Sequence, residues 1–331
     1  MAIPHVRSLL GSLLLIFLAA APGLGGHRAD APHYRVVHGW PQLPAGEILG
    51  QATGVGIDSK QNVWVFHRAG REWSDPMPDE AIDRPTIAVF DGRTGKRLRF
   101  WGAKSFVMPH GLTVDHDDNV WLTDVGTHQV FKYSPDGRLL MTLGERRVSG
   151  ADRTHFNLPT DVAVLRDGSF YVSDGYQNTR VVKFSANGEY QFEWGEKGNG
   201  PGEFDLPHGI ALDAAGRVYV ADRSNARVQI FTPAGKYVSE WKGPTFGRPY
   251  SVAIAATNRA VVVDGGDQPE SGPDRSGAAV VNLEGRVLSR FGSFGNQDGQ
   301  FRLAHDVAVD RVGTVYVVDA WGQRVQKFIR R

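Results

Sequence analysis

The stretch Pro207–Gly243, PHGIALDAAGRVYVADRSNARVQIFTPAGKYVSEWKG, contains four short runs rich in β-branched and aromatic residues. Turn sequences separate the runs: Asp213-Ala-Ala-Gly216 lies between the first two, and Pro233-Ala-Gly235 lies between the last two. Asp-x-x-Gly and Pro-x-Gly between such runs indicate hairpin turns. The stretch therefore predicts a unit of four antiparallel strands.

Similar units recur along the chain and begin roughly every 40 to 60 residues, a period typical of propeller blades. They run over Ala52–Gly102, Pro109–Gly144, Pro159–Gly195, Pro207–Gly243, Pro249–Gly292 and Ala304–Ile329. The last unit is short of a fourth strand, and the strand-like segment Tyr34–Trp40 has no neighbour in sequence. We therefore predict an all-β fold over residues 32–331, a six-bladed β-propeller of four-stranded blades. The N-terminal strand is expected to close the ring, because an open ring would leave two sheet edges unpaired.

The N-terminal segment differs from the repeats. An apolar run, Leu9–Ala21, follows two basic residues and precedes several small ones. This pattern is typical of a secretory signal peptide over residues 1–31, cleaved near residue 21 or 31, with an uncleaved anchor as the alternative. The run is too short for a comfortable membrane span, and no later segment is long or apolar enough. We therefore predict a secreted or periplasmic protein whose mature chain has no stable membrane span.

The composition narrows the classes of partner and of metal site. The 331 residues include 37 Lys and Arg against 36 Asp and Glu, and no basic run appears, so nucleic acid is not an expected partner. The chain has no cysteine, which excludes disulfides and thiolate zinc sites. Histidines and carboxylates are left as the strong side-chain ligands for a metal.

Histidines recur at the start of every second unit, as His110, His208 and His305. At the same position, the other three units have Thr53, Thr160 and Tyr250. We call this position of the repeat the alternating column. In a ring of six units, alternate positions are related by threefold symmetry, so the three imidazoles should converge on the axis. A single histidine at a strand start would more often be structural, but three in alternation favour a divalent metal, zinc first.

Three further residues are expected on the same face of the ring. The second strand of each blade runs back toward the start of the first, which places Arg68, Tyr176 and Arg223 beside the histidines. Each also has a structural interpretation: an arginine can pair with a neighbouring acid, and the tyrosine can serve in packing. Two insertions, Trp73–Pro85 and Gly265–Gly277, are predicted to be loops over the mouth of the channel. A metal with two guanidiniums and a phenol suits an anionic substrate.

Asp306 follows His305 directly. Neighbours in a strand point to opposite sides, so Asp306 is not expected to share the metal of the histidines. Its carboxylate and backbone carbonyls of adjacent units could hold a second, harder cation. Only one carboxylate is visible in the sequence for such a site.

Seven segments together resemble one enzyme family, the peptidyl-α-hydroxyglycine α-amidating lyases, which are six-bladed propellers of NHL repeats. The segments are Gly54-Val-Gly-Ile-Asp58, Val65-Phe-His-Arg68, Met108-Pro-His-Gly-Leu112, Ser173-Asp-Gly-Tyr176, Leu206-Pro-His208, Ala221-Asp-Arg223 and His305-Asp306. The likeness extends from about Gly50 to Phe328, with these landmarks in the order of the family. A generic NHL propeller would explain the repeats but not these residues.

The resemblance implies two metal ions. Catalytic zinc would be bound by the three histidines of the alternating column. A structural calcium would be held by Val55 and Leu112 through their backbone carbonyls and by Asp306 through its carboxylate. These residues belong to three consecutive units of the ring, so the arrangement is geometrically sound.

The resemblance also implies a reaction. Tyr176 would be the catalytic base, with Arg68 beside it and Arg223 also in the active site. The C–N bond of a peptidyl-α-hydroxyglycine, or of a smaller amidoglycolate, would be cleaved to an amide and glyoxylate. The chain departs from the animal members in having no disulfide beside the tyrosine, where Gln177 stands. It contains no segment like the copper monooxygenase that makes such substrates, so we expect a smaller substrate or a separate monooxygenase as partner enzyme.

Two other functions fit the repeat pattern. One is a different metal-dependent propeller enzyme, such as a lactonase-like hydrolase, whose site would centre calcium on carboxylates and Asn. The other is a binding module without enzymatic activity, which would hold no tight zinc. The three histidines favour zinc over a calcium-centred site, and metal analysis of the purified protein would distinguish an enzyme from a binding module.

Overall fold

The structure, a computed structural model, describes residues 31–244, 246–255, 258–266 and 274–331. The stretch that predicts the repeat forms blade 4, in which four strands pair antiparallel in chain order. These strands are β14 (Pro207–Leu212), β15 (Val218–Asp222), β16 (Arg227–Phe231) and β17 (Tyr237–Lys242). The predicted four-stranded unit is confirmed.

Four more blades have the same order of strands. Blade 1 consists of β2 (Ala52–Ile57), β3 (Asn62–His67), β4 (Ile87–Asp91) and β5 (Arg97–Trp101). Blade 2 consists of β6 (Pro109–Val114), β7 (Val120–Asp124), β8 (Gln129–Tyr133) and β9 (Leu139–Leu143). Blade 3 consists of β10 (Pro159–Val164), β11 (Phe170–Asp174), β12 (Arg180–Phe184) and β13 (Tyr190–Trp194). Blade 5 consists of β18 (Pro249–Ala255), β19 (Arg259–Asp264), β20 (Gly277–Asn282) and β21 (Val287–Phe291).

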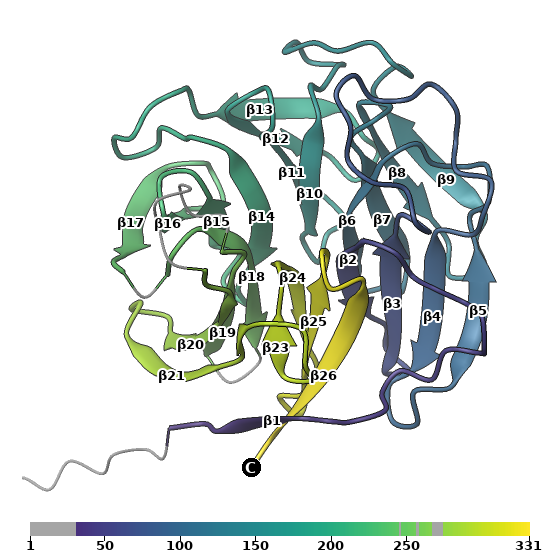
Figure 1. Ribbon diagram of the computed structural model, residues 1–331. Helices are drawn as coiled ribbons and strands as arrows, with labels where there is room; N and C mark the ends of the chain where they lie inside the picture. Colours follow the sequence, from purple (N-terminus) through teal and green to yellow (C-terminus); the bar gives the residue numbers. More distant parts are fainter. Residues whose placement is uncertain (1–30, 245, 256–257, 267–273) are drawn as a thin grey trace, which may run out of the picture. The chain divides into compact units, whose positions relative to one another are not determined.

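Blade 6 joins the two ends of the propeller domain. Its inner strands are β24 (Ala304–Val309), β25 (Val315–Asp319) and β26 (Arg324–Arg330), and its outer strand is β1 (Tyr34–Val36). The pairing is antiparallel, with Tyr34 opposite Arg330 and Val36 opposite Phe328. Figure 1 shows purple β1 at the lower end of yellow β26, near the C-terminus. The predicted closure by the N-terminal strand is confirmed, and a short parallel pair, β22 (Ser293–Phe294) with β23 (Gln300–Phe301), precedes this blade.

The apolar faces of the blades pack against one another around the ring. Among the described residues, six buried clusters each combine side chains of two adjacent blades. The cluster between blades 1 and 2, for example, contains Phe66 from β3 and Leu122 from β7. Each blade is therefore packed on both sides, and this packing positions the strands that line the centre of the ring.

Each innermost strand has an irregular start. The register with the second strand shifts after its first residue, for example between Pro159 and Asp161 and between Ala304 and Asp306. The same shift occurs in the other four blades. A β-bulge of this kind inserts an extra residue and re-aims its side chain. In every blade the shift spans the position that carries a histidine, threonine or tyrosine in the alternating column.

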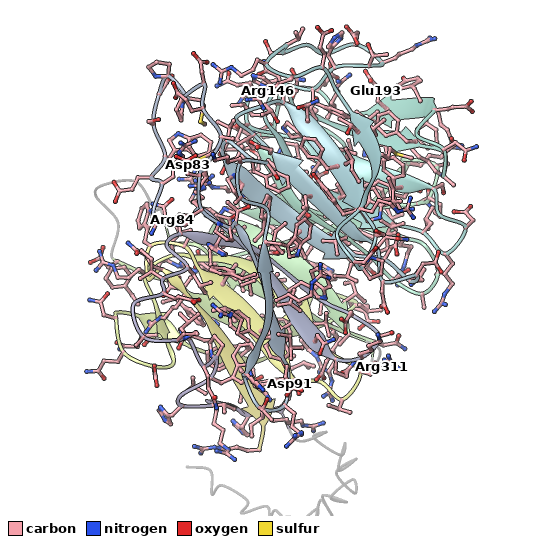
Figure 2. All side chains as sticks on the ribbon, turned by 90° about the vertical axis from the view of Figure 1, so that its right-hand side faces the viewer. Asp83, Arg84, Asp91, Arg146, Glu193 and Arg311 are labelled. Atoms are coloured by element: carbon pink, nitrogen blue, oxygen red, sulfur yellow. The ribbon has the colours of Figure 1, made fainter. Side chains whose placement is uncertain are left out.

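The ring has two distinct faces. The inner strands begin on one face, where the second strands end; the first turns, which join them, lie on the other. Figure 2 views the ring from its edge: Asp83 and Arg84 of the blade 1 insertion lie on the left, and Arg311 of the β24–β25 turn lies on the right. The predicted loop at Trp73–Pro85 contains no strand. The other predicted loop, Gly265–Gly277, includes residues 267–273, which lie outside the described part of the chain.

The predicted signal peptide also lies outside the described residues, except for Ala31. In the part of the chain that is described, no helix is long and apolar enough to cross a membrane.

Removal of the closing strand should destabilise the propeller. A chain that begins at residue 38 loses the β1–β26 pairing and exposes the edge of β26. At about 1 kcal/mol for each of roughly three lost hydrogen bonds, the melting temperature should fall by about 5 °C or more. Differential scanning calorimetry against a chain that begins at residue 32 measures the effect, and equal melting temperatures would contradict a role in closure.

Candidate metal centre and active site

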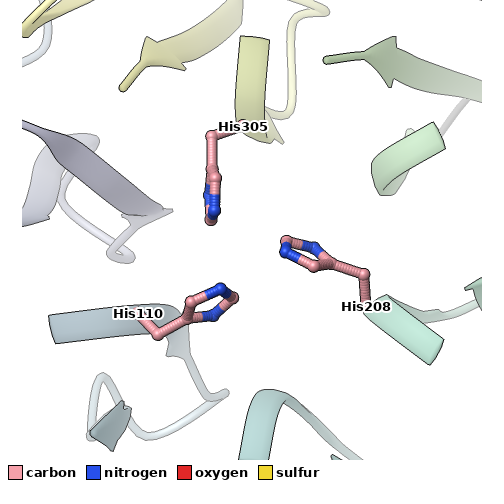
Figure 3. Close-up of side chains that lie close together, drawn as sticks. All are labelled: His110, His208 and His305. Atoms are coloured by element: carbon pink, nitrogen blue, oxygen red, sulfur yellow. The ribbon is translucent and has the colours of Figure 1, made fainter. Parts of the chain in front are cut away.

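His110, His208 and His305 meet at the centre of the ring, as predicted from their alternation. Their rings point toward one another from β6, β14 and β24 (Figure 3). One ligand nitrogen from each lies within 4.8 Å of the other two, and ring centroids are 4.8 to 4.9 Å apart. Among the described residues this is the one group of three or more His, Cys, Asp or Glu side chains close enough to hold a metal ion.

Each imidazole is oriented by the neighbouring blade. Its Nδ1 lies 2.7 Å from a backbone carbonyl oxygen of the next inner strand. The pairs are His110 with Thr160, His208 with Tyr250, and His305 with Thr53. Since a carbonyl only accepts, Nδ1 carries the proton, and each Nε2 keeps its lone pair toward the axis. The other three residues of the alternating column therefore supply the backbone carbonyls that orient the histidines.

The three imidazoles are neutral over the physiological pH range. Burial and the charge of Arg68 lower the pKa of His110 to about 3. Burial also holds the pKa values of His208 and His305 well below the usual range, and His110 and Arg223 lower both further. Neutral imidazole is the form that binds a metal, so the donor set fits a divalent ion such as zinc.

Tyr176 lies directly over the histidines. Its hydroxyl is 3.1 Å from Nε2 of His110 and 3.3 Å from Nε2 of His208. The preceding residue permits this approach: a Cβ on Gly175 would lie 1.7 Å from the carbonyl oxygen of Pro207. The structure therefore places the phenol beside the histidines, as predicted, with its hydroxyl at two of their Nε2 atoms.

Arg68 is buried beside the first histidine. The backbone N–H of Arg68 donates to Gln51 just before β2, so the arginine adjoins the start of its inner strand. Its Nε donates to the Pro109 carbonyl at 3.1 Å, and its Nη1 donates to Oε1 of Gln51 at 2.6 Å. Burial lowers the pKa of Arg68 to about 10, which leaves it charged at neutral pH, and attraction to Tyr176 acts in the opposite direction.

Arg223 approaches from the opposite blade. Its backbone N–H donates to Leu206 at 3.1 Å, just before β14. Its guanidinium carbon lies 4.0 Å from the ring centroid of Tyr250, a cation–π contact, and its charge reaches all three histidines. The Tyr250 ring in turn packs against His208, with centroids 4.9 Å apart.

Two residues near the histidines were missed by sequence reasoning. Trp73 comes from the blade 1 insertion, and its ring centroid lies 5.1 Å from that of Tyr176 and 5.3 Å from the guanidinium carbon of Arg68. No repeat pattern marks this residue. Asp161 lines the channel with Asp306. The sequence contains a signal for it, because Asp161 follows Thr160 of the alternating column just as Asp306 follows His305.

The two carboxylates are buried and line the same cavity as the histidines. Asp306 accepts from the backbone N–H of Val55 at 2.8 Å and from the Ser251 hydroxyl at 2.6 Å. Asp161 accepts from the backbone N–H of Ile210 at 3.1 Å. Burial raises the pKa of Asp306 to about 6, and burial together with repulsion by Asp306 raises that of Asp161. A second carboxylate, Asp161, thus lines the channel beside the one that was visible in the sequence, Asp306.

Comparison with known proteins agrees with the repeats. The NHL repeat family matches residues 106–133, 156–184 and 204–231, which fall on blades 2, 3 and 4. Peptidyl-alpha-hydroxyglycine alpha-amidating lyase 2 of Drosophila melanogaster is 32% identical, and the alignment covers 91% of this chain and 77% of that protein. The chain belongs to the peptidyl-α-hydroxyglycine α-amidating lyase family. The resemblance inferred from the seven segments is thereby confirmed.

Some other relatives are much longer than this chain, and one is named only for its repeats and not for a reaction. Peptidyl-glycine alpha-amidating monooxygenase B of Xenopus laevis is 36% identical over 85% of this chain, which spans about a third (34%) of that protein. NHL repeat-containing protein 3 of Homo sapiens is 31% identical, with 91% of this chain and 86% of that protein covered. Family membership alone therefore does not assign the reaction.

Solved structures agree in fold. A streptogramin B lyase superposes with a TM-score of 0.57 at 13% identity, covering 90% of this chain and 98% of the other. A gluconolactonase from Xanthomonas campestris gives a TM-score of 0.60 at 14% identity, covering 91% and 95%. At such low identity these similarities concern the propeller alone.

Loss of one histidine should reduce the dependence of stability on pH. In the metal-free protein His110 stays neutral down to about pH 3, whereas the unfolded chain takes up a proton near pH 6.5. Its contribution to stability is therefore present above pH 6.5 and is lost as the pH falls toward 3. At pH 4.5 the loss is about 2 to 3 kcal/mol for such a histidine.

Thermal unfolding of chelated wild-type protein and of His110→Gln between pH 7 and pH 4.5 tests this expectation. The melting temperature of the variant should fall less steeply with pH. The buried aspartates have the opposite dependence, but they are present in both proteins. Parallel curves would show that His110 is not held neutral.

Proposed function

We propose that this protein is a zinc-dependent lyase that cleaves the C–N bond of a peptidyl-α-hydroxyglycine or a smaller amidoglycolate, giving an amide and glyoxylate. One observation carries the proposal: a phenol hydroxyl lies 3.1 and 3.3 Å from the Nε2 atoms of two of three converging neutral histidines. A relative that covers most of the chain is named for this activity, which supports the same reaction.

The histidine cluster fits zinc on the chemistry of its donors. His110, His208 and His305 would hold the ion through Nε2, since each Nδ1 is engaged with a carbonyl. Three protein nitrogens leave a coordination position open, as in catalytic zinc sites. Zinc, when bound, supplies Lewis acidity that lowers the pKa of a hydroxyl group.

Residues of this chain bind the substrate and transfer the proton. Arg68 and Arg223 bind and orient the substrate carboxylate, for which a guanidinium offers a two-pronged contact. Tyr176 takes the hydroxyl proton at its phenolate oxygen, and the charge of nearby Arg68 favours that ionised form. The C–O bond becomes a carbonyl as the C–N bond breaks, and its electron pair goes to nitrogen. Return of the proton to nitrogen completes the amide and leaves glyoxylate.

We further propose that the channel below the histidines holds a structural calcium ion, bound by the Val55 and Leu112 carbonyls and by the Asp306 carboxylate. Asp306 touches Val55 directly, and a Cβ added to Gly54 would lie 2.6 Å from the backbone nitrogen of Leu112, so the three strands adjoin closely. Two buried carboxylates without a cation are costly, which supports a site for a hard divalent ion.

Asp306→Ala should abolish stabilisation by calcium. A cation that binds only the folded state at 100 times its dissociation constant contributes about 2.7 kcal/mol. The melting temperature of the wild-type protein should therefore rise on adding calcium after chelation, and that of the variant should not. Asp117→Ala, at an exposed turn, is the control. An equal rise in both variants would remove Asp306 from the site.

Release of glyoxylate from α-hydroxyhippurate tests the reaction. The protein is assayed as purified, after chelation, and after zinc is added back. Activity that is lost on chelation and restored by zinc supports the proposal. If zinc binds in a 1:1 ratio and no glyoxylate appears, the reaction is a different one.

Tyr176→Phe should retain zinc and lose most of its turnover. The change removes only the hydroxyl, so packing against Trp73 is preserved. Loss of a general base costs about 100- to 10,000-fold in rate. Turnover within threefold of wild type, at unchanged zinc content, would exclude the phenol as the base.

We also propose that the protein acts outside the cytoplasm, on the pattern of its N-terminal segment, and receives its substrate from a separate monooxygenase. The relatives that are named as monooxygenases support a link to that chemistry. Fractionation of expressing cells and inactivation of the candidate monooxygenase would test the two statements.

A binding module without activity is the other candidate, since a relative of similar length is named only for its repeats. Zinc analysis separates the two: the lyase holds about one zinc per chain and loses it in His208→Ala, whereas a scaffold needs none.

A further inference from the structure

Trp73 is an exposed aromatic residue beside the catalytic groups. The exposed fraction of this residue is 41%, although the indole lies against Arg68 and Tyr176, which come from blades 1 and 3. Part of its surface is thus covered by Arg68, which is proposed to bind the substrate carboxylate, and by Tyr176, which is proposed to take the hydroxyl proton. The rest of the residue is exposed to solvent beside these two side chains.

The segment that carries Trp73 is fixed to blade 2. Met77 packs on the small cluster of Val107, Met108 and Val125, which also supports Tyr176. Arg147 donates to the Pro78 carbonyl at 2.8 Å and pairs with the carboxylate of Asp79.

A second set of hydrogen bonds holds the start of the same segment in place. Arg71 donates from one nitrogen to the carbonyls of Glu80, at 2.6 Å, and of Val107, at 2.9 Å. The insertion is therefore attached on both sides of Trp73, and the indole has a defined place against the active site.

We infer that Trp73 is the wall of a subsite for the acyl group of the substrate, and that this subsite favours aromatic and bulky apolar acyl groups over small ones. This inference rests on the proposed lyase reaction. The acyl group is attached to the scissile nitrogen, one atom from the carbon that bears the hydroxyl and the carboxylate. If Tyr176 takes the hydroxyl proton and Arg68 binds the carboxylate, the residue that touches both lies next to the acyl group.

The chemistry of the indole sets the preference. An aromatic pair contributes attraction beyond the burial of area alone, equivalent to about 2- to 12-fold in affinity. A methyl group in the same place covers little of the indole. The exposed apolar surface of Trp73 is then covered only when a larger acyl group is bound.

The test compares two substrates that differ only in the acyl group, α-hydroxyhippurate with a benzoyl group and N-acetyl-α-hydroxyglycine with an acetyl group. For wild-type protein, kcat/KM should be about 10-fold higher for the benzoyl substrate, through KM. In Trp73→Ala this ratio should fall to about 2 or less, while Trp73→Phe should keep most of it. Tyr237→Ala, an exposed aromatic on outer strand β17, is the matched control and should leave the ratio unchanged.

A structural role for Trp73 gives a different result. If the indole only positions Tyr176 and Arg68, Trp73→Ala lowers kcat for both substrates equally and leaves their ratio intact. That outcome overturns the inference, as does a wild-type protein without preference for the benzoyl group.

Binding of unreactive analogues separates this inference from the proposed reaction. Hippurate and N-acetylglycine lack the hydroxyl, and their affinities for zinc-loaded protein can be measured by calorimetry. Tighter binding of hippurate that is lost in Trp73→Ala supports the subsite even if no glyoxylate is ever released. Equal affinities of both ligands for wild type and variant would overturn it.

Discussion

The hydrogen bond from each histidine to the next blade is the interaction on which the site depends. Three Nδ1 atoms each lie 2.7 Å from a carbonyl oxygen of a residue that has no metal-binding side chain. These bonds select the tautomer, orient the rings and join the six blades in pairs around the axis. Histidines alternate with other residues because one blade supplies the imidazole and the next blade supplies the carbonyl that accepts its hydrogen bond.

This arrangement requires a closed ring. The acceptor for His305 is Thr53, which lies 252 positions earlier in the chain, so the last pair exists only because blades 6 and 1 adjoin. Closure in turn rests on β1, which completes blade 6. Packing between all neighbouring blades then keeps three side chains from distant parts of the sequence at a common centre.

The charges around the centre are arranged in layers. Arg68 and Arg223 lie on the mouth side and help to hold the imidazoles neutral, whereas Asp161 and Asp306 lie in the channel below. A substrate carboxylate at the mouth and a hard cation in the channel would each complement the nearest layer. Each arginine also packs against an aromatic ring, Arg68 on Trp73 and Arg223 on Tyr250.

The sequence by itself determined the all-β blades, their number, the closing strand and the three histidines, because short-range strand and turn patterns repeat at a regular period. It also placed Arg68, Tyr176 and Arg223 on the face of the histidines, since the position of a residue within its repeat decides the face. Only the tertiary structure decided which carbonyls orient the imidazoles, that Asp161 joins Asp306, and that Trp73 lies against Tyr176. The register shifts and the path of an insertion arise from contacts between distant segments, and such contacts leave no period in the sequence.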